Sequence, residues 1–164
     1  MVWRALQPRW APTLAANPLH LGEAQLQYLR ALAGPPAKPP HPGQETYEMA
    51  CLPCHQPEGK GLPGVYPPLA GSEWVQGKSD ALIRIVIHGL TGPIEVAGQR
   101  YGGPDSVPMP GMAGLTDQQI AEVLSYIRKD FGAGASPVPA GEVKRIREST
   151  ATRTEPWSVA ELPR

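Results

Sequence analysis

The run Cys51-Leu52-Pro53-Cys54-His55 constrains this chain of 164 residues more than any other feature, because it uses both of its cysteines. Two cysteines separated by two residues and followed directly by a histidine form the attachment pattern of a c-type haem. The thiols can reach the two vinyl groups on one haem edge, and the histidine then lies under the iron. The single run therefore predicts one covalent haem c, held by Cys51 and Cys54, with His55 as an iron ligand.

Three other uses of a Cys-x-x-Cys pair explain the sequence less well. A structural zinc site needs four ligands, but the remaining histidines do not stand at zinc-finger spacing: His20, His41 and His88. A thioredoxin-like pair would follow a strand of a βαβ unit, whereas residues 44–50 have the pattern of a helix. A disulfide could span two intervening residues, but the position of His55 directly after the second cysteine would then be a coincidence.

The balanced charge and the hydropathy of the chain give no support for nucleic-acid binding, for binding to an anionic membrane or for a membrane span. Lys+Arg and Asp+Glu both number 15, so the balanced charge gives no argument for nucleic acid or an anionic membrane. No stretch approaches the roughly 20 apolar residues of a membrane span. We therefore expect no nucleic-acid partner and no transmembrane segment in this chain.

The start of the chain lacks the apolar core of a signal peptide. Covalent haem attachment generally takes place outside the cytoplasm, so an exported protein is expected. Either the signal has been removed, or the chain is part of a longer exported polypeptide. The sequence leaves both possibilities open.

Three regions are expected along the chain. Residues 1–41 form an N-terminal extension with one helix and a proline-rich linker, which either packs on the rest or ends a preceding domain. Residues 42–132 form the haem domain. Residues 133–164 form a C-terminal extension with a short helix over 140–150 and with Trp157 as an anchor. The chain contains 18 glycines and 21 prolines, which favours long loops.

Helical periodicity predicts an all-α domain with three core helices, over residues 42–52, 79–89 and 117–130. The middle segment contains Ile85-Val86-Ile87 and could also be a strand, but Ser79 as a cap and Gly89 as a stop favour a helix. Thr116 and Gln119 have the spacing of a capping box at the start of the last helix.

The second iron ligand is expected to be a methionine, because a thioether stabilises ferrous haem and suits electron transfer. Met109 and Met112 both lie in the loop before the last helix. Pro108 and Pro110 restrict the backbone of Met109, which suits a rigidly presented ligand. We assign Met109, with Met112 as the alternative.

The order of these motifs resembles that of class I, monohaem cytochromes c. An aromatic residue four positions before the first cysteine is followed by Cys-x-x-Cys-His, Pro-x-Leu, Met-Pro and a last helix with Tyr-Ile-Arg. The resemblance covers about residues 42–132 and implies a cytochrome c fold. It also implies that the first and last helices cross, with Gly43 and Tyr47 against Val123 and Tyr126.

The resemblance assigns further residues to the haem site. Pro67-Pro68-Leu69 is similar to the segment that passes under the haem. This similarity implies that Leu69 contacts the haem and that the Pro67 carbonyl accepts a hydrogen bond from His55 Nδ1–H, which would fix the ring. Tyr101 is expected at the haem as well, either as a donor to a propionate or as a packing ring.

Other polar residues have two interpretations each. Arg84 and Arg100 either neutralise propionates or are solvated at the surface. Trp74 either bonds a propionate or belongs to the core. His88 is a conceivable iron ligand, but a cationic ring at the end of the middle helix also suits the helix dipole.

The stretches 66–72, 90–94 and 154–157 resemble bacterial periplasmic cytochrome domains that are fused to, or are subunits of, quinoprotein-type dehydrogenases. This similarity implies a periplasmic electron carrier, not itself an enzyme, that passes electrons from a dehydrogenase to a respiratory acceptor. Its partners would be redox proteins, with a fused or associated dehydrogenase as donor. The alternative is a haem enzyme, or a sensor of a gas or peroxide, with an open distal site.

Overall fold

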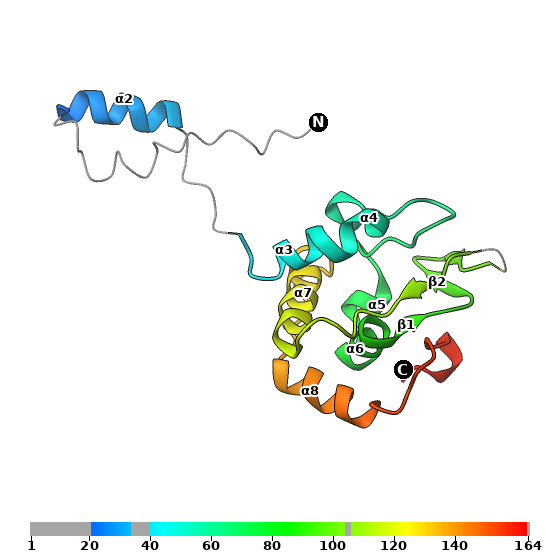
Figure 1. The fold of residues 1–164 in the computed structure, drawn as a ribbon. Helices are drawn as coiled ribbons and strands as arrows, with labels where there is room; N and C mark the ends of the chain where they lie inside the picture. Colours follow the sequence, from blue (N-terminus) through cyan, green and yellow to red (C-terminus); the bar gives the residue numbers. More distant parts are fainter. Residues whose placement is uncertain (1–20, 34–39, 104–105, 164) are drawn as a thin grey trace. The chain divides into compact units, whose positions relative to one another are not determined.

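The computed structural model describes residues 21–33, 40–103 and 106–163, and the chain divides into two compact units, residues 1–39 and 40–164 (Figure 1). In the first unit, helix α2 (Glu23–Ala33) carries the described part of the helix expected in the N-terminal extension. The start expected at Asn17 and Pro18 lies outside the described residues, as does most of the proline-rich linker.

The two cysteines are delivered by one helical run over residues 44–55, which we call the attachment helix. It consists of α3 (Gln44–Thr46), a π-helical turn η1 (Tyr47–Cys51) and α4 (Leu52–His55). The prediction of 42–52 therefore began too early and ended too soon. Gln56 ends the helix with φ 61, so His55 occupies its last turn.

The attachment helix crosses α7 (Asp117–Asp130), which matches the expected last helix residue for residue. Its capping box is present, since Thr116 Oγ1 accepts from Gln119 N at 3.2 Å and Gln119 Oε1 accepts from Thr116 N at 2.9 Å. At the crossing, a Cβ on Gly43 would overlap the Glu122 carbonyl group. The ring centroids of Tyr47 and Tyr126 lie 5.6 Å apart. The crossing implied by the resemblance is thus present.

The middle helix α6 (Ser79–His88) is a helix and not a strand. Gly89 ends it with φ 89, a conformation that glycine adopts without strain. The expected role of Ser79 as a cap was wrong: Lys78 occupies the cap position, and Ser79 Oγ instead donates to Glu142 Oε1 at 2.8 Å. The serine therefore joins two helices that are far apart in sequence.

Short elements that the sequence did not predict lie in the loops. Within residues 40–103 and 106–163 these are η2 (Pro57–Gly59), α5 (Glu73–Gln76) and the strands β1 (Gly89–Leu90), β2 (Ile94–Val96), β3 (Gln99–Tyr101) and β4 (Met109–Pro110). β1 pairs antiparallel with β4, and β2 pairs antiparallel with β3. The helices still dominate, as the predicted all-α class requires.

The C-terminal extension belongs to the same compact unit as the attachment helix. Its helix α8 (Ala140–Ser149) packs against α6 and α7, and Val143 and Ile146 are fully buried there. The chain then turns back toward β1 and forms the 3-10 turn η3 (Val159–Glu161) (Figure 1). Trp157 lies beside β1, so the extension wraps the unit with this residue as an anchor.

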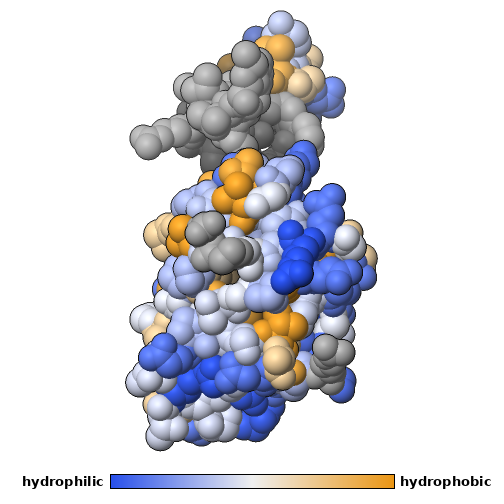
Figure 2. Space-filling model, turned by 90° about the vertical axis from the view of Figure 1, so that its right-hand side faces the viewer, coloured by the Kyte–Doolittle hydropathy of each residue, from blue (hydrophilic) through white to orange (hydrophobic). Residues whose placement is uncertain are grey.

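Two apolar clusters fill this unit. The larger one joins the attachment helix, α6, α7 and α8, whereas the smaller one joins α6, β1, β2, β3 and the C-terminal turn. On the face shown in Figure 2, hydrophobic surface is broken into separate patches among hydrophilic residues. Within the described residues, no helix combines the length and the apolar character that crossing a membrane would require.

Candidate functional site

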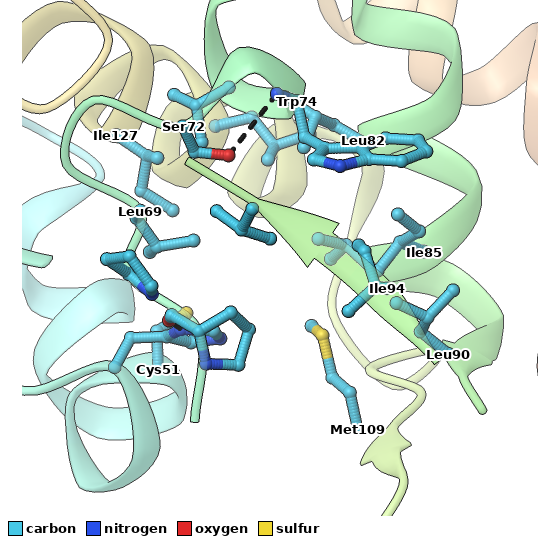
Figure 3. A pocket seen from close by; sticks show the side chains of 17 residues that line it. Cys51, Leu69, Ser72, Trp74, Leu82, Ile85, Leu90, Ile94, Met109 and Ile127 are labelled. Carbon is cyan, nitrogen blue, oxygen red and sulfur yellow. Dashed lines mark hydrogen bonds between the residues drawn. The ribbon is translucent and has the colours of Figure 1, made fainter. Parts of the chain in front are cut away.

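An apolar pocket opens between the attachment helix, α6, α7 and the strand β4 that carries Met109 (Figure 3). Hydrophobic side chains make up most of its wall. The lining comprises Cys51, His55, Pro67, Pro68, Leu69, Ser72, Trp74, Val75, Leu82, Ile85, Val86, Leu90, Ile94, Val96, Met109, Leu124 and Ile127. Such a wall fits the flat apolar body of a haem and excludes water from its faces.

The cysteine pair stands at the rim of this pocket. Cys51 and Cys54 are not joined in a disulfide and both are partly exposed, and Cys51 lines the pocket directly. Burial, and secondarily the nearby Cys54, raise the pKa of the Cys51 thiol to about 11, so it stays protonated at neutral pH. One cysteine in the wall of an apolar cavity and a second one three positions further along the same helix suit the double attachment that the motif predicts.

His55 projects from the last turn of the attachment helix and is buried. Its Nδ1 lies 3.0 Å from the carbonyl oxygen of Pro67, the partner that the sequence resemblance implies. Burial lowers the pKa of His55, although this hydrogen bond opposes the shift. A neutral ring that donates from Nδ1 leaves the lone pair of Nε2 for a metal, which is the arrangement typical of ligating histidines.

Met109 enters the pocket from the opposite side to Cys51 (Figure 3). It sits in β4, where Leu90 of β1 is its partner across the strand pair. Gly89 faces Pro110 in the same pair, and a Cβ on Gly89 would overlap the Met109 carbonyl oxygen. The sulfur-bearing side chain is thus presented from a paired strand and not from a free loop.

Met112, the alternative ligand, does not line the pocket. Its backbone N–H donates to the Val86 carbonyl at 2.7 Å and so ties the end of the loop to α6. Of the two methionines that sequence analysis singled out, only Met109 is among the residues around this cavity.

The other expected haem contacts divide into two groups. Leu69 and Trp74 line the pocket, and Trp74 Nε1 donates to the Glu95 carbonyl at 2.9 Å. Tyr101 is buried in the smaller cluster and does not line the pocket, and its hydroxyl donates to Gln99 Oε1 at 3.1 Å. The structure therefore places Tyr101 behind the pocket wall.

The remaining polar candidates are not brought to the pocket. Arg84 pairs with Asp80 on the same helix, and its guanidinium carbon lies 5.3 Å from the centre of the Trp157 ring. Arg100 is exposed. His88 is the last residue of α6, and its Nε2 lies 2.8 Å from Thr150 Oγ1.

Two residues near the site escaped sequence analysis. Ser72 is buried, lines the pocket and caps α5 by accepting from Trp74 N at 3.2 Å. A serine directly before Glu73 was the available signal for this cap. Arg128 is 6% exposed, and its side chain donates to the carbonyl groups of Val75, Gly77 and Ser136. No sequence signal distinguishes it from a surface arginine at a helix end.

Comparisons with known proteins agree on one family. The family model described as cytochrome c matches residues 40–130. Cytochrome c-552 of Thermus thermophilus is 40% identical over 119 residues, which is 67% of this chain and 87% of that protein. The cytochrome c subunit of alcohol dehydrogenase (quinone) from Gluconacetobacter polyoxogenes is 34% identical over 67% of this chain, and the fructose dehydrogenase cytochrome subunit of Gluconobacter japonicus is 36% identical over 64%. The chain spans only 23% and 22% of these two subunits.

Proposed function

Because the chain belongs to the cytochrome c family and so carries electrons on a covalently bound haem c, we propose that His55 and Met109 are its two axial ligands. The observation that carries this proposal is that both side chains line one apolar pocket, with Met109 entering from the side opposite Cys51 (Figure 3). Both axial positions are then filled by the chain itself, which leaves no position for a substrate.

Each residue of the proposed site has a defined task. Cys51 and Cys54 form the thioether bonds that prevent dissociation of the haem. The Pro67 carbonyl, 3.0 Å from His55 Nδ1, orients the ring and makes it a better electron donor to the iron. Leu69 lines the same pocket as Pro67 and His55 and would contact the haem there. Tyr101 supports the pocket wall from the second cluster.

The haem supplies reversible one-electron chemistry, and the chain sets how easily it proceeds. A methionine sulfur stabilises the reduced state and raises the reduction potential. The largely hydrophobic pocket wall excludes water and disfavours the extra positive charge of the oxidised state. Both effects are typical of a carrier that accepts electrons from a dehydrogenase.

We further propose a periplasmic location, a dehydrogenase as electron donor and a respiratory protein as acceptor. Three relatives are named as cytochrome subunits of dehydrogenases that act on alcohol, fructose and gluconate. Their similarity to this chain supports an associated or fused dehydrogenase. The balanced charge of 15 basic and 15 acidic residues suits docking through short-range contacts more than long-range steering.

The test compares the wild type with Met109→Ala and, as a matched control, Met112→Ala. Ferric haem with a methionine sulfur ligand has a weak far-red absorption band, and a six-coordinate ferrous haem binds carbon monoxide poorly. We expect the band in the wild type and in Met112→Ala, and its loss in Met109→Ala together with rapid carbon monoxide binding. Loss of the band only in Met112→Ala would assign that residue instead. Free carbon monoxide binding by the wild type would favour a gas-binding or catalytic haem.

A further inference from the structure

Trp157 lies along the edge of β1 that faces away from Met109 and β4. Leu90 pairs with Met109 on one edge of β1 and forms a parallel bridge with Trp157 on the other. Trp157 N donates to the Gly89 carbonyl at 3.0 Å, and Thr91 N donates to the Trp157 carbonyl at 2.8 Å. Both polar edges of this short strand are therefore occupied, one by the Met109 strand and the other by the C-terminal segment.

The strand between them has little support of its own. β1 contains only two residues, follows directly on the end of α6 at Gly89 and precedes Gly92, whose φ is 75. Short strands are stable only when neighbouring segments pack on them and pair with them. The side chains of Met109 and Trp157 also pack against the same apolar cluster, which contains Leu90.

The Trp157 ring is held from several sides. The guanidinium carbon of Arg153 lies 3.6 Å from its centre, that of Arg84 lies 5.3 Å away, and the His88 ring meets it edge-on at 6.2 Å. Cations over an indole face stabilise its position. Arg153 also pairs with Glu161 at 3.0 Å, so the turn after Trp157 is fixed to the same residue.

We propose that Trp157 is a positioning residue for the distal iron ligand: by completing the second edge of β1, it holds the strand against which Met109 is fixed. This inference rests on the proposed ligation by Met109. Without the indole ring, the backbone of residue 157 loses the packing and the cation contacts that hold it against β1, and Met109 leaves its position more often. An added ligand then replaces the sulfur more readily.

The experiment measures how fast imidazole replaces the methionine sulfur in the ferric holoprotein, followed by loss of the far-red band. Trp157→Ala is expected to accelerate this replacement about tenfold, which corresponds to about 1.4 kcal/mol. Trp157→Phe keeps an aromatic ring beside Arg153, Arg84 and His88 and should retain the wild-type rate.

Val143→Ala is the matched control, because it creates a cavity in α8 within the larger cluster, away from the β1 strand. It should lower overall stability and leave the replacement rate unchanged. Equal replacement rates in the wild type and Trp157→Ala would overturn the inference, as would equal acceleration by Val143→Ala.

If Trp157→Ala does not fold, Arg153→Ala removes the closest cation over the ring and should give a smaller acceleration of sulfur replacement. A wild-type band that survives in Met109→Ala would instead refute the proposed ligand.

Discussion

Gly43 lies against the carbonyl group of Glu122 so closely that a Cβ at this position would overlap backbone atoms of α7. The two helices that cross here are the one that carries the cysteines and the last core helix. Because the atoms in the way belong to the backbone, they cannot rotate aside as a side chain could. The close approach also brings Tyr47 and Tyr126 together behind the attachment site.

Gly43→Ala should therefore lower the free energy of unfolding of the holoprotein by about 3 kcal/mol, at the upper end of the usual cost of overpacking. Denaturant unfolding of the holoprotein measures this loss. Gly141→Ala is the matched control, since nothing lies within 4 Å of a Cβ at this position in α8. The control should gain about 0.5 kcal/mol from helix propensity. An equal response of both variants would show that the crossing is not tight.

The local signals in the sequence were sufficient for the attachment motif and for the last helix. Cys51, Cys54 and His55 are adjacent in the chain, and the capping box of α7 involves residues only three positions apart. The approach of Met109 to the same pocket depends on contacts between distant segments, and the proline residues around it were the only local sign.

The sequence could not predict features that depend on distant partners. β1 and β4 have two residues each, too few to show a strand period, and their paired residues lie 19 and 21 positions apart in the chain. Ser79 was expected to cap α6 but bonds to Glu142, 63 positions away. Tyr101 was expected at the haem but packs behind the pocket wall, because the β2–β3 pair carries its ring into the second cluster.

Arg128 joins α7 to two other segments, the end of α5 and the loop before α8, and this role can be tested directly. Its guanidinium donates to the Val75 and Gly77 carbonyl oxygens at 2.7 and 2.8 Å, and to that of Ser136 at 2.6 Å. Arg128→Met leaves these acceptors unpaired in a buried region, so the free energy of unfolding should fall by about 3 kcal/mol or more. Denaturant unfolding of the holoprotein measures the loss.

The exposed neighbour Lys129 provides the control for this change. Lys129→Met should change stability by less than about 0.5 kcal/mol. Arg128→Lys should recover only part of the loss, because an ammonium group cannot reproduce the planar fork that reaches three acceptors. Full recovery by lysine would mean that charge, and not the hydrogen-bond geometry, is what the site requires.

His88 makes stability depend on pH at the junction of α6 and the C-terminal segment. Burial lowers the pKa of His88, and the positive charges of Arg153, Arg147 and Arg84 lower it further. Between the unfolded pKa of about 6.5 and the lower folded value, the unfolded chain binds a proton that the folded chain does not. The free energy of unfolding should therefore decrease as the pH falls through this window.

The measurement is the denaturant midpoint of the holoprotein at about pH 7.5 and about pH 5, on either side of the ordinary histidine value. His88→Gln keeps a side chain that can bond to Thr150 Oγ1 but does not titrate. Its midpoint should decrease less than that of the wild type over the same interval. Identical decreases in both proteins would assign the pH dependence to other groups.

Glu161 closes the C-terminal turn through three interactions. Hydrogen bonds from the Ser158 hydroxyl and backbone N–H, and then from Arg153, lower the pKa of Glu161 to about 2 from an ordinary value of 4.5. The stabilisation that the Glu161 carboxylate gives the turn is fully present above its unfolded-state pKa, and it is lost as the pH falls toward its folded-state pKa.

Glu161→Gln should remove this pH dependence and lower the hydrogen-exchange protection of the Trp157 amide at neutral pH. Glu155→Gln, an exposed change in the same segment, should retain wild-type protection, since only the Glu155 backbone carbonyl bonds to Arg153. Equal protection in the two variants would show that the turn does not depend on the Glu161 carboxylate.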